Sequence, residues 1–110
     1  MPAIHHKTLA AGQWQELTLM EQLGNIGSEI SRARNWHGKD DTLFAAAVFR
    51  ALELIDLTVA DSRWRYRLKE ILRARECAVD AYYGGREYGT TWEDLDRYFL
   101  PYALAARKNR

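Results

Sequence analysis

The stretch that most constrains the fold runs from Phe44 to Val59 and contains the segment F-R-A-L-E-L-I-D-L-T-V. On a helix of about 100° per residue, its apolar side chains fill about two-thirds of the circumference. A helix as apolar as this one belongs in the middle of a protein. We therefore expect residues 44–59 to form a central helix that all other segments cover.

The segment at residues 18–38 reads as the first helix. Thr18 and Glu21 have the spacing of a capping box at its start, and a glycine ends it. Gly24 and Gly27 lie inside this helix, where each glycine costs about 0.5–1 kcal/mol relative to alanine. Two serines accompany them, Ser28 and Ser31. This group of small residues indicates the close approach of another backbone.

Two more helices are expected, over residues 63–83 and 91–106, because apolar residues recur there at helical spacing. Pro101 should face solvent and bend or divide the last helix. Short connections between four amphipathic helices predict an all-α, up-down-up-down four-helix bundle over residues 14–106. We expect a mobile arm before the bundle and a frayed tail after it, residues 1–13 and 107–110.

Composition narrows the class of protein. A chain of 110 residues with a net charge of +1 is expected to be one domain with no general attraction to polyanions. Its single cysteine, Cys77, suits a reducing cytosol, and no apolar run reaches the roughly 18 residues that span a bilayer. We expect a cytoplasmic protein with no membrane contact. The adjacent His5 and His6 are expected to be solvated rather than to bind metal.

The carboxylates favour a structural role over a metal site. A di-iron bundle requires Glu-x-x-His motifs, and no histidine follows a helical acid at that spacing, so we expect neither metal nor cofactor. Arg75 falls within an apolar arc and needs acceptors there. The expected result is a buried polar network of five residues: Glu29, Arg50, Glu53, Asp56 and Arg75.

Basic residues are concentrated between Arg63 and Arg75, where Glu70 is the one opposing charge. One interpretation is a nucleic-acid-binding strip that tracks a phosphate backbone, with Tyr66 as a stacking surface. Its members would be Arg63, Arg65, Lys69 and Arg73. The alternative is a solvated helix face that pairs with the acids further along the helix, Glu76 and Asp80.

The segment R-A-R-N-W-H, from Arg32 to His37, resembles the R-x4-6-H motif of HEPN ribonucleases. That resemblance implies a dimer in which the arginine stabilises phosphate charge and the histidine assists proton transfer, without metal. The sequence departs from the family pattern at Ala33, where such proteins often carry a polar residue. On a continuous helix the two side chains would also diverge by about 140°.

Longer motifs point to another group of proteins. They are W-x2-L-x3-E-Q-x2-N-I-x-S-E from Trp14, R-A-L-E-L-x-D-L-T from Arg50, R-E at Arg75 and Y-F at Tyr98. They resemble a group of small prokaryotic helical proteins with no assigned activity. The architecture is also similar in kind to the four-helix-bundle accessory proteins of diversity-generating reverse transcriptases, which form basic oligomeric rings.

No nucleophile–base pair or phosphate-cradling glycine loop is present in the sequence, which argues against an enzyme. We expect a non-enzymatic interaction module that self-associates and accompanies a nucleic-acid enzyme. Its expected partners are further copies of itself, a protein encoded nearby, and RNA or DNA. Self-association is inferred from the glycine and serine stripe of the first helix and from the aromatic residues near the C-terminal end. The alternative is the HEPN-like ribonuclease or a toxin-type protein.

Overall fold

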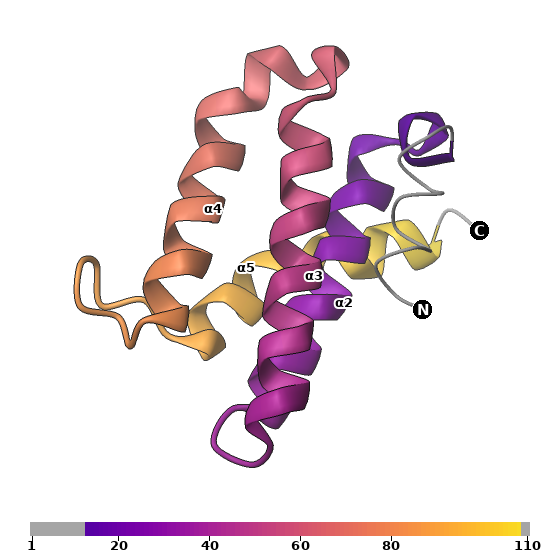
Figure 1. Ribbon diagram of the computed structural model, residues 1–110. Helices are drawn as coiled ribbons and strands as arrows, with labels where there is room; N and C mark the ends of the chain where they lie inside the picture. The colour runs from indigo at the N-terminus through magenta and orange to yellow at the C-terminus, as the bar shows by residue number, and fades with distance from the viewer. Residues whose placement is uncertain (1–12, 109–110) are drawn as a thin grey trace.

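A computed structural model describes residues 13–108 and confirms the predicted all-α four-helix bundle (Figure 1). The four helices are α2 (Leu19–Trp36), α3 (Asp41–Val59), α4 (Leu68–Tyr82) and α5 (Trp92–Lys108). Two short 3-10 helices accompany them, η2 (Trp14–Glu16) before α2 and η3 (Ser62–Arg67) before α4. No strand occurs within residues 13–108.

The predicted terminal segments lie mostly outside the described residues. Of the predicted arm, residues 1–13, the structure describes only the last residue, and His5 and His6 fall outside it. At the other end, α5 continues through Lys108, two residues into the predicted tail.

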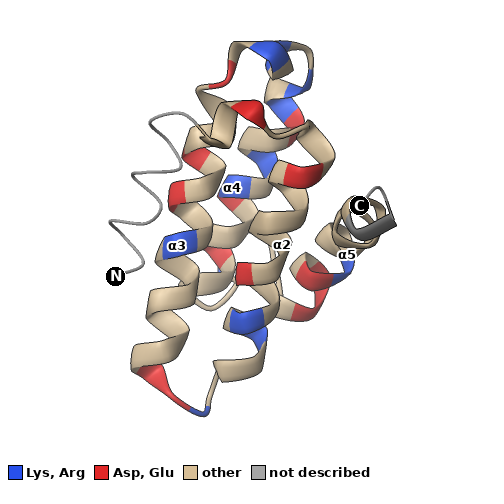
Figure 2. Cartoon of the chain, turned by 90° about the vertical axis from the view of Figure 1, so that its right-hand side faces the viewer, with Lys and Arg blue, Asp and Glu red and all other residues tan. Residues whose placement is uncertain are grey.

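Consecutive helices among α2, α3 and α4 are roughly antiparallel, and α5 has a different direction. The chain runs down α2, up α3 and down α4, as expected, and α5 then crosses these three at a steep angle (Figure 1). After the quarter turn of Figure 2, α5 is seen nearly end-on while the others stay upright. The fourth helix therefore lies across the bundle instead of alongside its neighbours.

The expectation that residues 44–59 form the centre is wrong, because α2 occupies that place. α2 buries nine residues against six in α3, and it packs against both α3 and α5. On α3, the side chain of Phe49 is 51% exposed. The apolar sequence of α3 serves one buried face and leaves part of the opposite side open to solvent.

The two glycines of α2 explain why it is central. A Cβ on Gly27 would lie 2.9 Å from the Cβ of Phe99, and one on Gly24 would lie 3.3 Å from the Cα of Ala103. Both contacts are with α5, so the predicted close approach of a backbone is confirmed. This use of the glycines also corrects the argument for self-association, because their small size is needed inside one chain.

The helix predicted over residues 63–83 is divided. Residues 62–67 form η3, in which Trp64 has φ −104° and ψ 20°, and α4 begins only at Leu68. The indole nitrogen of Trp64 donates to the side-chain oxygen of Gln22 at 3.0 Å. Gln22 is fully buried, so this bond turns η3 back towards α2 and away from the axis of α4.

The predicted helix ends are present. Thr18 and Glu21 form both hydrogen bonds of the capping box, at 2.9 and 3.1 Å. Gly84 follows α4 with a φ of +92°, a left-handed conformation that suits glycine. Pro101 is exposed, as expected, but α5 is one helix and is not divided there.

Candidate interaction surfaces

The ribonuclease motif does not form a catalytic pair within one chain. The guanidinium of Arg32 bonds to the carboxylate of Glu29, one turn earlier on α2. His37 follows the end of α2, and its ring packs 5.1 Å from Phe44 and 6.4 Å from Trp92, measured between ring centroids. The two side chains therefore contact different groups, and their meeting across a dimer stays a prediction. Among residues 13–108, no group of His, Cys, Asp and Glu could hold a metal ion.

The predicted polar network divides into two ion pairs. Glu29 is 5% exposed and accepts a hydrogen bond from Nε of Arg50 at 2.7 Å, which joins α2 to α3. Arg75 donates to Asp56 at 2.7 Å, but these side chains are 38% and 55% exposed. The expected burial of Arg75 is thus wrong, because its position on α4 is at the open edge beside α3. Glu53 is exposed and joins neither pair.

Arg63, the first member of the predicted basic strip, is part of a structural cluster. Its guanidinium bonds to Asp61 at 2.6 Å and to the carbonyl oxygen of Leu17 at 2.9 Å, and it lies over the ring of Trp64. Asp61 is buried and also accepts from Gln22 at 3.1 Å. Hydrogen bonds from Arg63 lower the pKa of Asp61 to about 2, against the opposing effect of burial. The guanidinium of Arg63 therefore takes part in structural hydrogen bonds, although its side chain is 41% exposed.

The rest of the strip is only partly available. Figure 2 shows basic residues gathered where η3 leads into α4. Arg73 lies 4.4 Å over the ring of Tyr88 and 3.8 Å from a carboxylate oxygen of Glu76. Arg65 and Lys69 are exposed, and within residues 13–108 neither has an ion-pair partner. These two cations, next to the 75% exposed Tyr66, are the members of the strip without an acidic partner in the described part of the chain.

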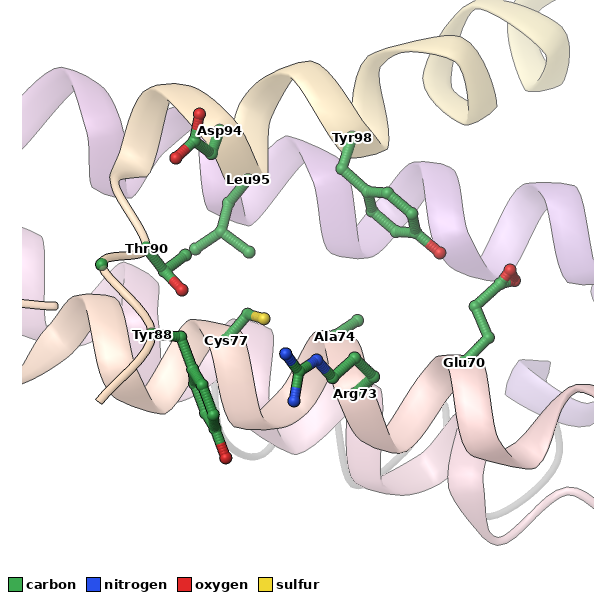
Figure 3. Close-up of a pocket in the computed structure, with 10 residues that line it drawn as sticks. Glu70, Arg73, Ala74, Cys77, Tyr88, Thr90, Asp94, Leu95 and Tyr98 are labelled. Atoms are coloured by element: carbon green, nitrogen blue, oxygen red, sulfur yellow. The ribbon is translucent and has the colours of Figure 1, made fainter. Parts of the chain in front are cut away.

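A groove opens between α4 and α5 where the two helices diverge (Figure 3). Its volume is about 320 Å³, and its lining is mostly apolar. Ala74 and the free thiol of Cys77 face it from α4, and Leu95 and Tyr98 face it from α5 (Figure 3). Burial, and then the neighbouring Tyr102, raise the pKa of Tyr98, so its hydroxyl stays protonated at neutral pH.

Asp80 does not line this groove, but it orders the loop that does. Its carboxylate is 5% exposed and accepts backbone hydrogen bonds from Glu87, Tyr88 and Thr90 at 2.8, 3.2 and 3.1 Å. Burial would raise the pKa of Asp80, but these bonds outweigh it and lower the pKa. The sequence suggested a solvated partner for basic side chains at this position. Asp80 instead fixes the loop that brings Tyr88 and Thr90 to the groove.

The outer side of α5 carries a second surface. Leu100 and Leu104 lie one turn apart and are 49% and 50% exposed. Two hollows of about 190 and 260 Å³ follow the seam between α2 and α5 beside them. Ser28 and Ala103 line both hollows, and Gly27 and Leu100 line the smaller one. Leu100 therefore borders the smaller hollow, and the larger hollow is lined by the polar side chains of Glu21 and Asn25 as well as by small residues.

Comparisons with known proteins add no assignment. No protein-family model, curated protein or solved structure matches the chain. The resemblance to small prokaryotic helical proteins thus stays a prediction. None of the described helices is both long and apolar enough to cross a lipid bilayer.

Proposed function

We propose that this protein is a non-enzymatic interaction module that self-associates through the outer side of α5. The observation that carries the proposal is the pair of half-exposed leucines, Leu100 and Leu104, beside the seam hollows. A two-fold interface places the same surface of each copy against the other. Leucines of one copy would then enter the hollows of its partner, while its own hollows receive the partner's leucines.

The small side chains along the seam between α2 and α5 also support this arrangement, although in a different way from the one that the sequence predicted. Gly24 and Gly27 are used by α5 of the same chain, whereas Ser28 is exposed and lines both hollows. Close packing of a second α5 against the seam would bury apolar surface now in contact with water, which stabilises association by about 25 cal/mol per Å². Self-association therefore rests on the outer edge of the glycine and serine stripe.

We further propose that the assembled module accompanies a nucleic-acid enzyme or a protein encoded nearby, with Arg65 and Lys69 as the contacts to RNA or DNA. In a symmetric assembly each copy adds these two unpaired cations, so the charge presented to a polyanion grows with the number of copies. This supports an accessory role better than a role for the isolated chain.

Sedimentation equilibrium tests the self-association. The chain has a mass of 12.8 kDa, and a species of at least twice that mass is expected at tens of micromolar. The double variant Leu100→Gln/Leu104→Gln should be monomeric, with an unchanged circular dichroism spectrum. Leu43→Gln is the matched control, because Leu43 is 41% exposed on α3 and should not affect assembly. A wild-type monomer, or equal effects of both substitutions, would contradict the proposal.

A further inference from the structure

We propose that the groove between α4 and α5 binds a small organic anion made of one carboxylate and a flat apolar body. The groove has about 320 Å³ of space, near the lower end of the range for small-molecule sites. Such a volume suits a single aromatic ring with a short side chain. Nothing in this proposal depends on self-association or on contact with nucleic acid.

The walls of the groove favour an apolar, flat body. Leu95 projects from α5 towards Cys77 on α4, and the ring of Tyr98 extends over the groove in the direction of Glu70 (Figure 3). The tyrosine offers a ring against which another ring can pack, and aromatic pairs contribute about 0.5–1.5 kcal/mol beyond the area they bury. The leucine, alanine and thiol offer no strong hydrogen-bonding group to a polar ligand. The body of a ligand in this groove is therefore expected to be apolar.

Arg73 supplies the charge that selects an anion. Its guanidinium lies 4.4 Å over the ring of Tyr88, and this stacking restricts its position at the edge of the groove. The nearest carboxylate is Glu76 at 3.8 Å, beyond the range of a hydrogen bond. Most of the five guanidinium donors are thus free to bind a ligand. A carboxylate can accept two of them at once, because the two planar groups match in geometry.

The two acids that line the groove already have cationic partners. Glu70 bonds to the guanidinium of Arg67 through both of its oxygens, one of them at 2.9 Å. Asp94 accepts from the backbone nitrogen of Thr91 at 3.3 Å and lies 3.5 Å from Arg97. Arg73 is the cation among the lining residues, and apart from its 3.8 Å ion pair with Glu76 its guanidinium donors are not hydrogen-bonded to an acid among the described residues. These donors therefore favour an anion over a cation.

The groove and the self-association surface lie on opposite sides of α5. Tyr98 lines the groove and Leu100 lies on the outer surface, and residues two apart on a helix differ by about 200°. A ligand can thus bind with the α5 surface free or covered. Loss of ligand binding and loss of assembly are separate results.

Backbone amide NMR shifts of Thr90, Leu95 and Tyr98 can follow the titration of 3-phenylpropionate into the protein. The expected dissociation constant is about 0.1–1 mM for a ligand of this size. 3-Phenylpropionamide has the same shape without the charge, and should bind about tenfold more weakly because it loses a charge-assisted hydrogen bond.

Three variants test the assignment of roles. Arg73→Gln should weaken the binding of 3-phenylpropionate about tenfold and leave the binding of 3-phenylpropionamide unchanged. Lys69→Gln is the matched control, because Lys69 is an exposed cation one turn away that does not line the groove, and should leave both probes unchanged. Ala74→Leu should fill the groove and abolish binding of both probes.

Several results would overturn the proposal. Equal affinities for 3-phenylpropionate and 3-phenylpropionamide would show that Arg73 does not bind the carboxylate. If Lys69→Gln lowers the affinity for 3-phenylpropionate as much as Arg73→Gln does, the anion is attracted by positive charge in general and not by a specific site. If the amide signals of Thr90, Leu95 and Tyr98 do not shift at ligand concentrations up to several millimolar, the groove is not a binding site. If Ala74→Leu fails to fold, the comparison of Arg73→Gln with Lys69→Gln still decides the question.

Discussion

Replacing Gly27 by alanine tests the packing of α2 against α5 directly. The new Cβ would lie 2.9 Å from the Cβ of Phe99, closer than two such atoms can sit, so one helix must move. Overpacking of a buried contact costs about 1–3 kcal/mol. Alanine in a helix regains about 0.5–1 kcal/mol over glycine. The two ranges leave a loss of up to about 2.5 kcal/mol in the free energy of unfolding, and we expect about 1–2 kcal/mol because a contact of 2.9 Å forces an atom to move.

Gly24→Ala is the matched variant, because it makes the same chemical change one turn away. Its Cβ would meet atoms of α5 at 3.3 Å, which a shift of a few tenths of an ångström can accommodate. The gain in helix propensity then nearly balances the crowding, and we expect a change within about 0.5 kcal/mol of zero. The two glycines should therefore differ although they belong to one stripe.

The contact at Gly27 also predicts which second substitution fails to restore stability. The crowded atom of Phe99 is its Cβ, which leucine keeps, so Phe99→Leu should not relieve the strain of Gly27→Ala. The two effects should add to within about 0.5 kcal/mol. A strongly favourable coupling would mean that the aromatic ring, and not the backbone of α5, is the obstacle.

Guanidinium unfolding followed by tryptophan fluorescence measures these free energies, and circular dichroism gives the melting temperature. A loss of 1–2 kcal/mol should lower the Tm of a domain of this size by about 4–12 °C. If Gly27→Ala is as stable as the natural protein or more stable, α5 does not approach α2 as described, and the reasoning fails.

Three further outcomes follow from the charged residues. The lowered pKa of Asp61 contributes at most about 2 kcal/mol to the free energy of unfolding, and this contribution is complete above pH 4 and lost as the pH falls towards 2. In Asp61→Asn, the free energy of unfolding measured in urea should therefore depend less on pH between pH 4 and pH 2. Arg50→Ala leaves the buried Glu29 with less compensation and should cost about 1–3 kcal/mol in a thermal melt, whereas Arg75→Ala breaks an exposed pair and should cost under about 1 kcal/mol. Asp80→Ala removes the acceptor of three backbone bonds, so limited proteolysis should cut the 83–91 loop faster, while unchanged cleavage would contradict this role.

Most helix boundaries were predictable because their signals are local, and the start of α4 at Leu68 is the exception. The Thr18 capping box and the glycines after α4 act over three or four residues, and the structure has both. The apolar residues that recur at helical spacing over residues 91–106 include Trp92, Leu95 and Phe99, and all three are buried. Short-range rules therefore account for most of the secondary structure.

Which helix lies at the centre could not be predicted from hydrophobicity. α3 is the more apolar helix, but α2 is central because Gly24 and Gly27 admit α5. The glycines were recognised, yet the sequence does not say which backbone they receive. The same limit applies to Gln22, whose partners Asp61 and Trp64 lie 39 and 42 residues away. Contacts of this kind depend on tertiary packing.

The candidate sites were less predictable than the fold. Runs of like charge suggested a basic strip, but Arg63 pairs with Asp61, two residues earlier, which the helical pattern did not assign to it. The groove was not anticipated, because it results from the divergence of α4 and α5 and has no sequence motif. The loop after α4 offered one signal, because an acid such as Asp80 shortly before the glycine pair Gly84-Gly85 can order a turn.

The packing of α5 against α2 also constrains how the chain acquires its structure. Contacts between residues 19–36 and 92–108 close a loop that contains the whole of α3 and α4. Closing that loop costs conformational entropy before any contact between α2 and α5 can form. Folding should therefore be slower than in bundles where each helix packs mainly against the next helix in the sequence. A cut within residues 84–89 would open the loop and leave α5 as a separate peptide. Its recognition surface on α2 would remain, so the two fragments should reassemble in solution.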